Sequence, residues 1–367
     1  MLRLLVSAGG TGGGVYPALA VLSALGERAE VLWVGGQGGM EATLVQRAGI
    51  PFEAIPAAGL HGVGLRAMPG NLMRLAAGIP AANRILKRFN PDVLFFTGGY
   101  VGVPVAVAGR KRPQAVFVPD VEPGLALRWI TRLADVIMVS TERAKEFYSR
   151  QKQVLVTGYP TRSWMEPTPA EDARVALNLD REIPVVLIFG GSRGARSINE
   201  AVWSDLPRLL ESCQVLHITG ELDWPRVSEF VSAFQSGLTG RYHAQRYLHE
   251  EMALAMSAAD LVVSRAGAAT MGEFPRFGLP AILVPYPHAW RYQQVNAAYL
   301  REAGGAIVLE DELLKGRLVD RILELLANQE SLKQMGQAMH ALDRPKAADR
   351  IANAITELAA ERSEDNG

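Results

Sequence analysis

Short runs of β-branched and aliphatic residues alternate along this chain with longer segments of helical length and pattern. Up to residue 160 the predicted strands are residues 2–7, 30–34, 92–97, 114–118, 135–139 and 153–156. Segments with helical periodicity, such as 16–25, 41–48 and 68–89, separate most of them. Strand and helix alternating in this way predict an α/β fold with a parallel sheet covered by helices on both faces.

The alternation stops and then restarts. A polar stretch containing Pro160, Pro167 and Pro169 is followed by a second series of predicted strands at 185–189, 214–218, 260–263, 280–284 and 306–309. A chain of 367 residues also exceeds twice the ~150 residues of a typical domain. We therefore predict two doubly wound, Rossmann-like domains, 1–160 and 161–344, with a final helix at about 345–361.

Both series open with a glycine-rich turn after the first strand: Gly9-Gly10-Thr11-Gly12-Gly13-Gly14 and Gly190-Gly191-Ser192-Arg193-Gly194. Backbone N–H groups of such turns can approach a phosphate closely, helped by the helix that follows. Neither turn matches a dinucleotide fingerprint or a P-loop. For one turn alone, tight packing of strand on helix explains the glycines equally well, but two turns in register favour two phosphate sites facing a cleft between the domains.

Composition excludes several classes of protein. Lys and Arg total 38 and Asp and Glu total 38, so no global positive charge favours nucleic acid. A single cysteine, Cys213, cannot form an intramolecular disulfide and indicates a reducing compartment. The sequence shows neither a signal peptide nor an apolar run long enough to span a membrane, so we expect no secretion and no spanning helix.

The most specific segment follows strand 260–263. Ser264-Arg265-Ala266-Gly267-Ala268-Ala269-Thr270 leads into a helix with Glu273, whose carboxylate could accept both hydroxyls of a ribose. A further strand and a Pro-rich loop precede Gln293 and Gln294, two adjacent amides. Solvated surface positions are the alternative for Glu273 and Gln293, but the order of these features argues against it.

With these motifs the chain resembles the MurG family of N-acetylglucosaminyltransferases and, more broadly, glycosyltransferases of the two-domain GT-B fold. The resemblance runs from Gly9 to about Gly305. It includes both glycine-rich turns, Met40-Glu41, Gly98-Gly99-Tyr100-Val101, Gly158-Tyr159-Pro160-Thr161-Arg162 and the segment from Ser264 to Asn296. It implies transfer of N-acetylglucosamine from UDP-N-acetylglucosamine to lipid I in peptidoglycan synthesis, with inversion at the sugar and without a cofactor or metal.

The resemblance also implies roles for individual residues. Contacts to the donor would come from Arg162, Ser192, Ala268, Ala269, Thr270, Glu273, Gln293 and Gln294. Thr11, Gly12 and Gly13 would face the reacting centre and the acceptor diphosphate. The final helix would cross back onto the first domain.

Two acceptor-side motifs depart from the family. Gly14 stands where the family has a histidine, the usual candidate for the catalytic base, and residues 117–124 replace a His-Glu-Gln-Asn motif, which places Asp120 at the asparagine position. Asp120 or Glu122 could remove the proton instead, since a partly buried carboxylate is a competent base. Alternatively, Asp120 only satisfies a turn, the acceptor differs, or activity is lost.

A basic and apolar segment suggests contact with an anionic membrane surface. Residues 54–91 contain no acidic residue, and their basic residues (Arg66, Arg74, Arg84, Lys87, Arg88) alternate with apolar ones at helical spacing (Leu65, Met68, Leu72, Leu75, Ile79). A core helix with solvated basic neighbours is the other reading. Lipid I is membrane-bound, which favours peripheral association at the cytoplasmic face of the cell membrane.

The leading hypothesis is thus a lipid I N-acetylglucosaminyltransferase. A glycosyltransferase of the same fold with another lipid or small-molecule acceptor is one alternative, and a catalytically weak UDP-sugar-binding regulatory protein is another. All three keep the donor motifs, so the sequence does not separate them.

Overall fold

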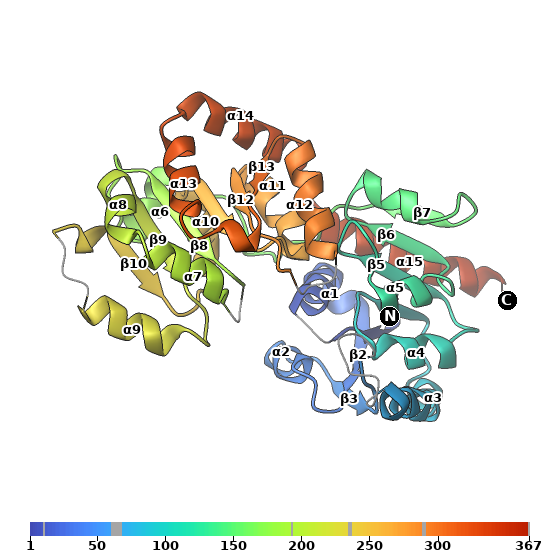
Figure 1. Cartoon of the computed structure of the whole chain (residues 1–367). Coiled ribbons are helices and arrows are strands. Elements are labelled where there is room, and N and C mark those ends of the chain that lie inside the picture. Colours follow the sequence, from blue (N-terminus) through green and yellow to red (C-terminus); the bar gives the residue numbers. More distant parts are fainter. Residues whose placement is uncertain (10–11, 60–67, 192–193, 234–236, 288–290, 366–367) are drawn as a thin grey trace. The chain divides into compact units, whose positions relative to one another are not determined.

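The structure, a computed structural model, describes residues 1–9, 12–59, 68–191, 194–233, 237–287 and 291–365. The chain divides into two compact units (Figure 1). The first comprises Met1–Ser163 and Arg344–Gly367, and the second comprises Trp164–Asp343. Each unit is an α/β layer structure built on its own parallel sheet.

The described part of the first unit contains a seven-stranded sheet in the order β3-β2-β1-β4-β5-β6-β7. Its strands are β1 (Leu2–Ser7), β2 (Ala29–Gly36), β3 (Phe52–Ile55), β4 (Val93–Phe96), β5 (Gln114–Val118), β6 (Val136–Val139) and β7 (Gln153–Val156). In register, Ser7 at the end of β1 lies beside Phe96 at the end of β4. The chain order reverses between β1 and β4, and in open parallel sheets the crevice outside such a switch point is the usual ligand site.

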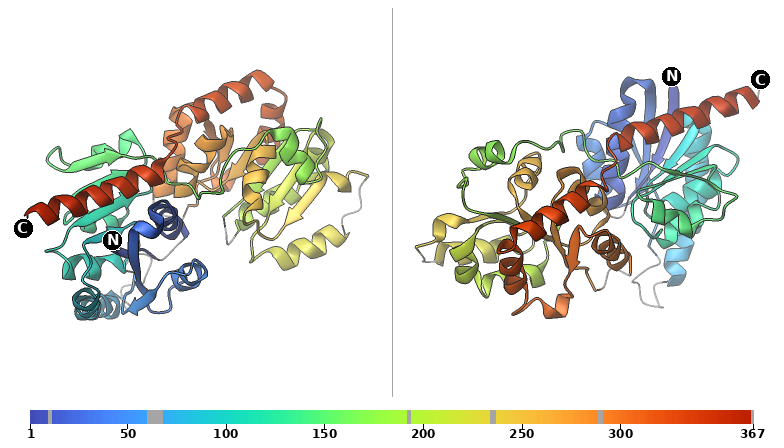
Figure 2. Two further views of the ribbon diagram at one scale, coloured as in Figure 1. Left: turned by 180° about the vertical axis from the view of Figure 1, so that it is seen from behind. Right: turned by 90° about the horizontal axis from the view of Figure 1, so that it is seen from above.

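Helices cover both faces of this sheet. They are α1 (Gly12–Leu25), α2 (Glu41–Arg47), α3 (Met68–Phe89), α4 (Gly102–Ala108), α5 (Leu125–Ile130) and α15 (Ala347–Asp365), with the short 3₁₀ helices η1 (Gly26–Arg28) and η2 (Glu142–Phe147). One core joins α3, α4 and α5 to the sheet through fully buried side chains such as Leu94, Phe96 and Val116. On the other face, α15 packs against α1 and strands β4 to β6 (Figure 2).

The last helix is joined to the first unit by specific bonds as well as by packing. The Arg350 guanidinium donates to the carbonyl oxygen of Thr157, at 2.9 Å from Nε. Ile351 and Ile355 are fully buried. The final segment is therefore an integral layer of this unit.

The second unit repeats the same architecture. Its described residues form a six-stranded sheet in the order β10-β9-β8-β11-β12-β13. The strands are β8 (Val185–Phe189), β9 (Gln214–Ile218), β10 (Tyr242–Gln245), β11 (Leu261–Ser264), β12 (Ala281–Leu283) and β13 (Ala306–Val308). The switch point here lies between β8 and β11, where Phe189 pairs with Ser264.

The helices of the second unit complete its layers. They are α6 (Ala170–Ala176), α7 (Arg196–Trp203), α8 (Leu206–Ser212), α9 (Trp224–Ala233), α10 (Glu251–Ala258), α11 (Glu273–Phe277), α12 (Tyr292–Glu302), α13 (Leu318–Leu326) and α14 (Gln329–His340), with 3₁₀ helices η3 (Thr239–Arg241), η4 (Ala268–Met271) and η5 (Asp311–Leu313). Within the described ranges, no helix is long and apolar enough to span a bilayer.

Two strands were not predicted from the sequence. β3 and β10 occupy the same place in the two sheets, as the outer neighbours of β2 and β9. Both are short, and in each the burial of side chains is only partial. An edge strand has one neighbour and one open side, so its residues do not show the continuous apolar run of a buried parallel strand.

Candidate functional site

The first glycine-rich turn lies at the switch point of the first sheet. Gly12, Gly13 and Gly14 begin α1 directly after β1. The Thr97 hydroxyl, at the end of β4, donates a hydrogen bond to the Gly14 carbonyl oxygen at 2.5 Å. Thr11 lies outside the described residues. The first N–H groups of an α-helix have no partner within the helix, so the start of α1 can bind an anion.

Gly99 shows how closely the neighbouring turn approaches. Its φ is +87°, and a Cβ atom placed on it would lie 2.6 Å from the Gly9 carbonyl oxygen. The two backbones therefore meet with no side chain between them. Only glycine fits position 99, because both the conformation and the space exclude a side chain.

Gly14 differs from Gly99, because the fold does not require a glycine there. A Cβ atom at this position would lie 3.4 Å from the Thr97 carbonyl oxygen and 3.7 Å from Gly98 Cα, which are ordinary packing distances. The absence of the family's histidine is therefore not imposed by the backbone.

The segment 117–124 contains two carboxylates, Asp120 and Glu122, whose environments differ. Asp120 follows β5, the neighbour of β4, and is partly exposed at the same edge of the sheet. Glu122 is 2% exposed and forms an ion pair with Arg128 of α5. Because Asp120 is partly exposed and Glu122 is almost fully buried, Asp120 is the more accessible of the two to an acceptor.

Arg162 falls in the first unit, whereas the sequence boundary at residue 160 placed it in the second domain. Its guanidinium lies over the ring of Tyr16, 4.8 Å from the centroid. Tyr16 belongs to α1, the helix that follows the glycine-rich turn. Within this unit the positive charge of Arg162 therefore lies near α1.

Four of the predicted donor residues lie close together in the second unit. Ala268, Ala269 and Thr270 form η4, and Glu273 begins α11 directly after it. Glu273 is 8% exposed. α12 contacts η4, and the Asn296 amide of α12 donates to the Ala266 carbonyl oxygen at 3.2 Å. Ser192, in the second glycine-rich turn, lies outside the described residues.

Gln293 and Gln294 occupy the first turn of α12. The Gln293 side-chain oxygen accepts a hydrogen bond from the Tyr286 backbone N–H at 2.9 Å, whereas Gln294 is exposed. This bond fixes the Gln293 amide with its NH₂ group unused by Tyr286. The amide can then donate to a sugar hydroxyl.

Arg265 belongs to the segment 265–270 that follows β11, but the sequence alone predicts no role for it. Its guanidinium pairs with Asp311, donates to Ser197 Oγ at 2.8 Å and lies 5.2 Å from the centroid of the Tyr286 ring. It also donates to the Val284 carbonyl oxygen at 3.2 Å. One side chain thus ties together segments that follow β8, β11, β12 and β13.

A buried polar network includes residues of α7, the helix that follows the second glycine-rich turn. Asp223 accepts hydrogen bonds from Arg196 Nε and from the Asn199 amide, both at 3.0 Å. Asn199 also contacts the His217 ring at 2.9 Å, and the other ring nitrogen of His217 contacts Tyr242. Burial lowers the pKa of His217 to about 3 and raises that of Tyr242 to about 12, so both are neutral near pH 7.

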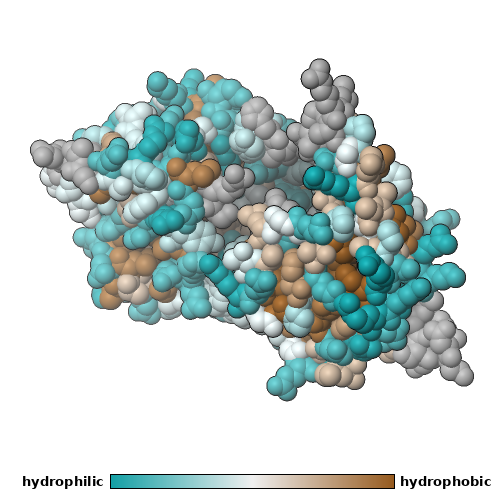
Figure 3. Space-filling model, turned by 90° about the horizontal axis from the view of Figure 1, so that it is seen from below, coloured by the Kyte–Doolittle hydropathy of each residue, from teal (hydrophilic) through white to brown (hydrophobic). Residues whose placement is uncertain are grey.

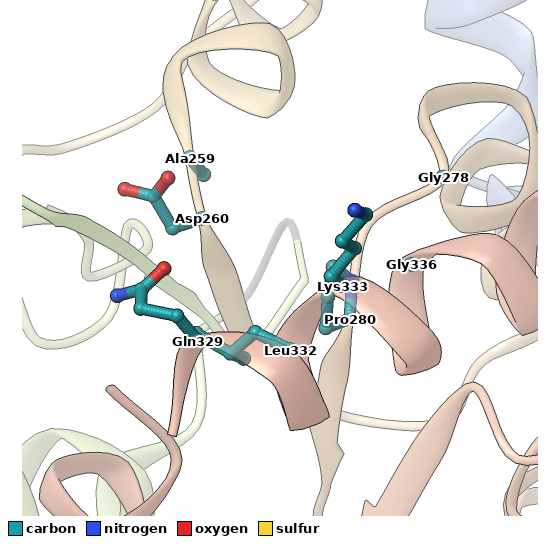
Figure 4. A pocket seen from close by; sticks show the side chains of 8 residues that line it. All are labelled: Ala259, Asp260, Gly278, Pro280, Gln329, Leu332, Lys333 and Gly336. Carbon is teal, nitrogen blue, oxygen red and sulfur yellow. The ribbon is translucent and has the colours of Figure 1, made fainter. Parts of the chain in front are cut away.

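Two cavities are lined by other residues. One, of about 280 Å³, lies at the amino ends of β11 and β12, opposite their carboxyl ends, and its lining includes Asp260, Gln329 and Lys333 (Figure 4). Asp260 there is paired with Arg174. The other, of about 380 Å³, is lined by Arg128, Tyr148 and neighbours. Among the described residues that line them, none is a predicted site residue.

The segment predicted to meet a membrane divides between core and surface. On α3, Leu75 is buried in the core, whereas Met68 and Leu72 are 40% and 61% exposed. Arg74, Arg84, Lys87 and Arg88 are exposed on the same helix. Figure 3 shows apolar and hydrophilic surface side by side on this side of the first unit. Leu65 and Arg66 lie outside the described residues.

Comparisons with known proteins agree with the fold. The glycosyltransferase family 28 N-terminal domain matches residues 4–139, and the family 28 C-terminal domain matches residues 185–351. Together with the two parallel-sheet units, these matches define a glycosyltransferase of the GT-B class.

Relatives narrow this class. A Roseiflexus protein is 37% identical, over 98% of this chain and 96% of its own length, and a Bacillus licheniformis protein is 36% identical, over 97% and 99%. Both are named UDP-N-acetylglucosamine–N-acetylmuramyl-(pentapeptide) pyrophosphoryl-undecaprenol N-acetylglucosamine transferase. The crystal structure of Acinetobacter baumannii MurG is 25% identical, with a TM-score of 0.76, covering 97% of this chain and 100% of that one. The chain belongs to the MurG family.

Proposed function

We propose that this protein transfers N-acetylglucosamine from UDP-N-acetylglucosamine to lipid I, the undecaprenyl-linked N-acetylmuramyl pentapeptide, and so forms lipid II for peptidoglycan. The relatives named above support this proposal over nearly the whole chain. The structural observation that carries it is the donor-side cluster, in which Glu273, η4 and Gln293 gather at the carboxyl edge of the second sheet.

On this proposal the second unit binds the donor. Glu273 accepts hydrogen bonds from the ribose hydroxyls, and the backbone of Ala268, Ala269 and Thr270 surrounds the nucleotide. Ser192 and its turn bind the diphosphate, while Gln293 and Gln294 contact the sugar. Backbone N–H groups stabilise the negative charge that grows on UDP as it leaves, and Arg162, which belongs to the first unit, adds positive charge.

The first unit binds the acceptor. Thr11, Gly12 and Gly13 contact the lipid-linked diphosphate, and the acceptor hydroxyl attacks the anomeric carbon from the face opposite UDP, which inverts the configuration. Asp120 removes the hydroxyl proton. Its partial exposure supports this role, because an acceptor hydroxyl can reach Asp120, whereas Glu122 is only 2% exposed.

The exposed apolar and basic residues of α3 support a further part of the proposal. Met68, Leu72 and the neighbouring arginines would lie in the interface of an anionic leaflet, at the cytoplasmic face of the cell membrane where lipid I is presented. Association would be peripheral.

The test is UDP release from UDP-N-acetylglucosamine with and without a lipid I analogue. Wild type should show turnover that depends on the acceptor, and Asp120→Asn should lower kcat by roughly a hundredfold or more. Asp92→Asn, in the same unit, is a control for loss of a surface carboxylate. Absence of acceptor-dependent turnover in wild type would remove the proposed reaction, and unchanged turnover in Asp120→Asn would remove the proposed base.

A further inference from the structure

Glu41 is a buried carboxylate in the first unit to which the proposed reaction assigns no role. It is the first residue of α2, just beyond the carboxyl end of β2, and is only 2% exposed. Burying a carboxylate is unfavourable unless hydrogen bonds compensate for the lost water. Its surroundings therefore indicate what it stabilises.

The carboxyl group of Glu41 lies directly against glycine backbone. Oε1 accepts a hydrogen bond from the Gly36 N–H at 2.8 Å. A Cβ atom placed on Gly9 would lie 2.5 Å from Oε1 and 3.1 Å from Oε2, and one placed on Gly39 would overlap the same group. No side chain separates the carboxylate from the main chain at Gly9, the first residue of the glycine-rich turn.

Gly9 is enclosed from a second direction as well. The Gly99 backbone packs against it so closely that a Cβ on Gly99 would lie 2.6 Å from the Gly9 carbonyl oxygen. Gly9 is thus held between Glu41, which follows β2, and Gly99, which follows β4. The segment that continues from Gly9 leads into Gly12 and Gly13 at the start of α1.

We propose that Glu41 is a positioning residue: its carboxylate fixes Gly9, and so helps to place Gly12 and Gly13 at the start of α1, whose backbone binds the diphosphate of the lipid-linked acceptor. This inference rests on the proposed function for the identity of that ligand. Glu41 does not touch the substrate. It sets how well the turn is preformed, and so the affinity for the acceptor.

The second unit has a buried carboxylate at the corresponding place. Glu41 lies five positions beyond Gly36 at the end of β2, and Asp223 lies five beyond Ile218 at the end of β9. Asp223 is also 2% exposed and bonds Arg196 and Asn199 of α7, the helix after the second glycine-rich turn. The repeated architecture thus has an acidic residue behind each turn, which supplies a matched control.

The test compares KM values for the two substrates. Glu41→Ala should raise KM for a lipid I analogue roughly ten- to a hundredfold, because backbone that Glu41 no longer holds must become ordered when the acceptor binds. Its KM for UDP-N-acetylglucosamine should stay within about twofold. Glu41→Gln, which keeps an oxygen for the Gly36 N–H, should show a smaller rise in acceptor KM. Asp223→Asn and the exposed Glu27→Gln should leave the acceptor KM unchanged.

Two outcomes in Glu41→Ala would overturn the inference. One is a general loss of folding, seen as a rise in both KM values or a lower active fraction, and the other is an unchanged acceptor KM. Hydrogen exchange gives a readout that is independent of the reaction. Peptides spanning residues 12–20 and 94–102 should exchange faster in Glu41→Ala and at the wild-type rate in Asp223→Asn. If wild type fails to use lipid I, this exchange result still decides the positioning role, and unchanged exchange refutes it.

Discussion

Replacing Asp311 by asparagine should loosen the donor side of the second unit. The Asp311 carboxylate pairs with Arg265 and accepts a hydrogen bond from Ser197 Oγ at 2.8 Å. The side chains of Arg265 and Asp311 are only 10% and 20% exposed, so solvent screens the pair weakly. Asparagine preserves the shape and one oxygen but removes the charge.

The magnitude follows from this burial. Removing one partner of a fully buried pair costs about 3–5 kcal/mol. The residual exposure, and the oxygen that asparagine keeps for Ser197, reduce the expected loss to about 2 kcal/mol. For a domain of 150–250 residues, each kcal/mol shifts Tm by about 2–4 °C, so Tm of the second unit should fall by about 4–8 °C.

The same change should weaken donor binding. Arg265 packs on the Tyr286 ring, and the Tyr286 N–H fixes Gln293, so a displaced arginine leaves Gln293 less well oriented. KM for UDP-N-acetylglucosamine should therefore rise several-fold, by roughly threefold to tenfold. Thermal unfolding followed by fluorescence, and donor-dependent UDP release, measure the two effects.

Asp320→Asn is the matched control. Asp320 pairs with Arg208 at 2.7 Å, but their side chains are 39% and 49% exposed. Such a surface pair contributes ~0–1 kcal/mol. If Asp311→Asn destabilises the second unit no more than Asp320→Asn does, the argument from burial is wrong.

Changes at three further positions test other parts of the structure. Gly14→Ala should lower Tm by no more than about 2 °C, because a Cβ there meets only ordinary contacts. Gly14→His should raise the turnover of an Asp120→Asn background by at least about tenfold. Gly99→Ala should lose more than about 2 kcal/mol in urea unfolding, because φ is +87° and the methyl group would overlap Gly9. His217→Gln should make stability depend less on pH. Folding lowers the pKa of His217 from 6.5 to about 3, so the wild-type protein keeps its full stability above pH 6.5 and loses about 2 kcal/mol of it as pH falls to 5.

Controls distinguish these effects from general damage. Gly49→Ala also places a side chain at positive φ but meets nothing within 4 Å, so its loss of stability should be the smaller of the two glycine changes. For His217, equal slopes of stability against pH in wild type and variant would contradict its assignment as a buried neutral ring. For Gly14, a large fall in Tm would show that the fold does require glycine there.

The buried central strands of both sheets could be predicted from the sequence. β1, β5 and β8 match their expected bounds, because continuous apolar runs identify central parallel strands. β3 and β10 were missed because their side chains are only partly buried and include polar residues such as Glu53 and His243. The apolar central strands were thus enough to predict the two-unit fold, but not the number of strands in each sheet.

The candidate site shows a similar division. Residues in ordered motifs, such as Glu273 and Gln293, were singled out from the sequence, and their roles stay predictions. The contacts of Glu41 and Arg265 could not be predicted, because each joins segments far apart in the chain: Arg265 reaches Ser197 and Asp311, 68 and 46 positions away. A motif identifies such a residue as unusual, but only the packed structure shows what it holds.

The first unit consists of two pieces of chain, with α15 completing a layer that begins at residue 1. During synthesis, the whole second unit leaves the ribosome before Ile351 and Ile355 can cover the first sheet. Because domains fold largely as they emerge, the second unit can finish folding while the first still exposes an uncovered apolar face. A chain that ends after residue 343 would therefore contain all of the second unit, but its first unit would lack α15.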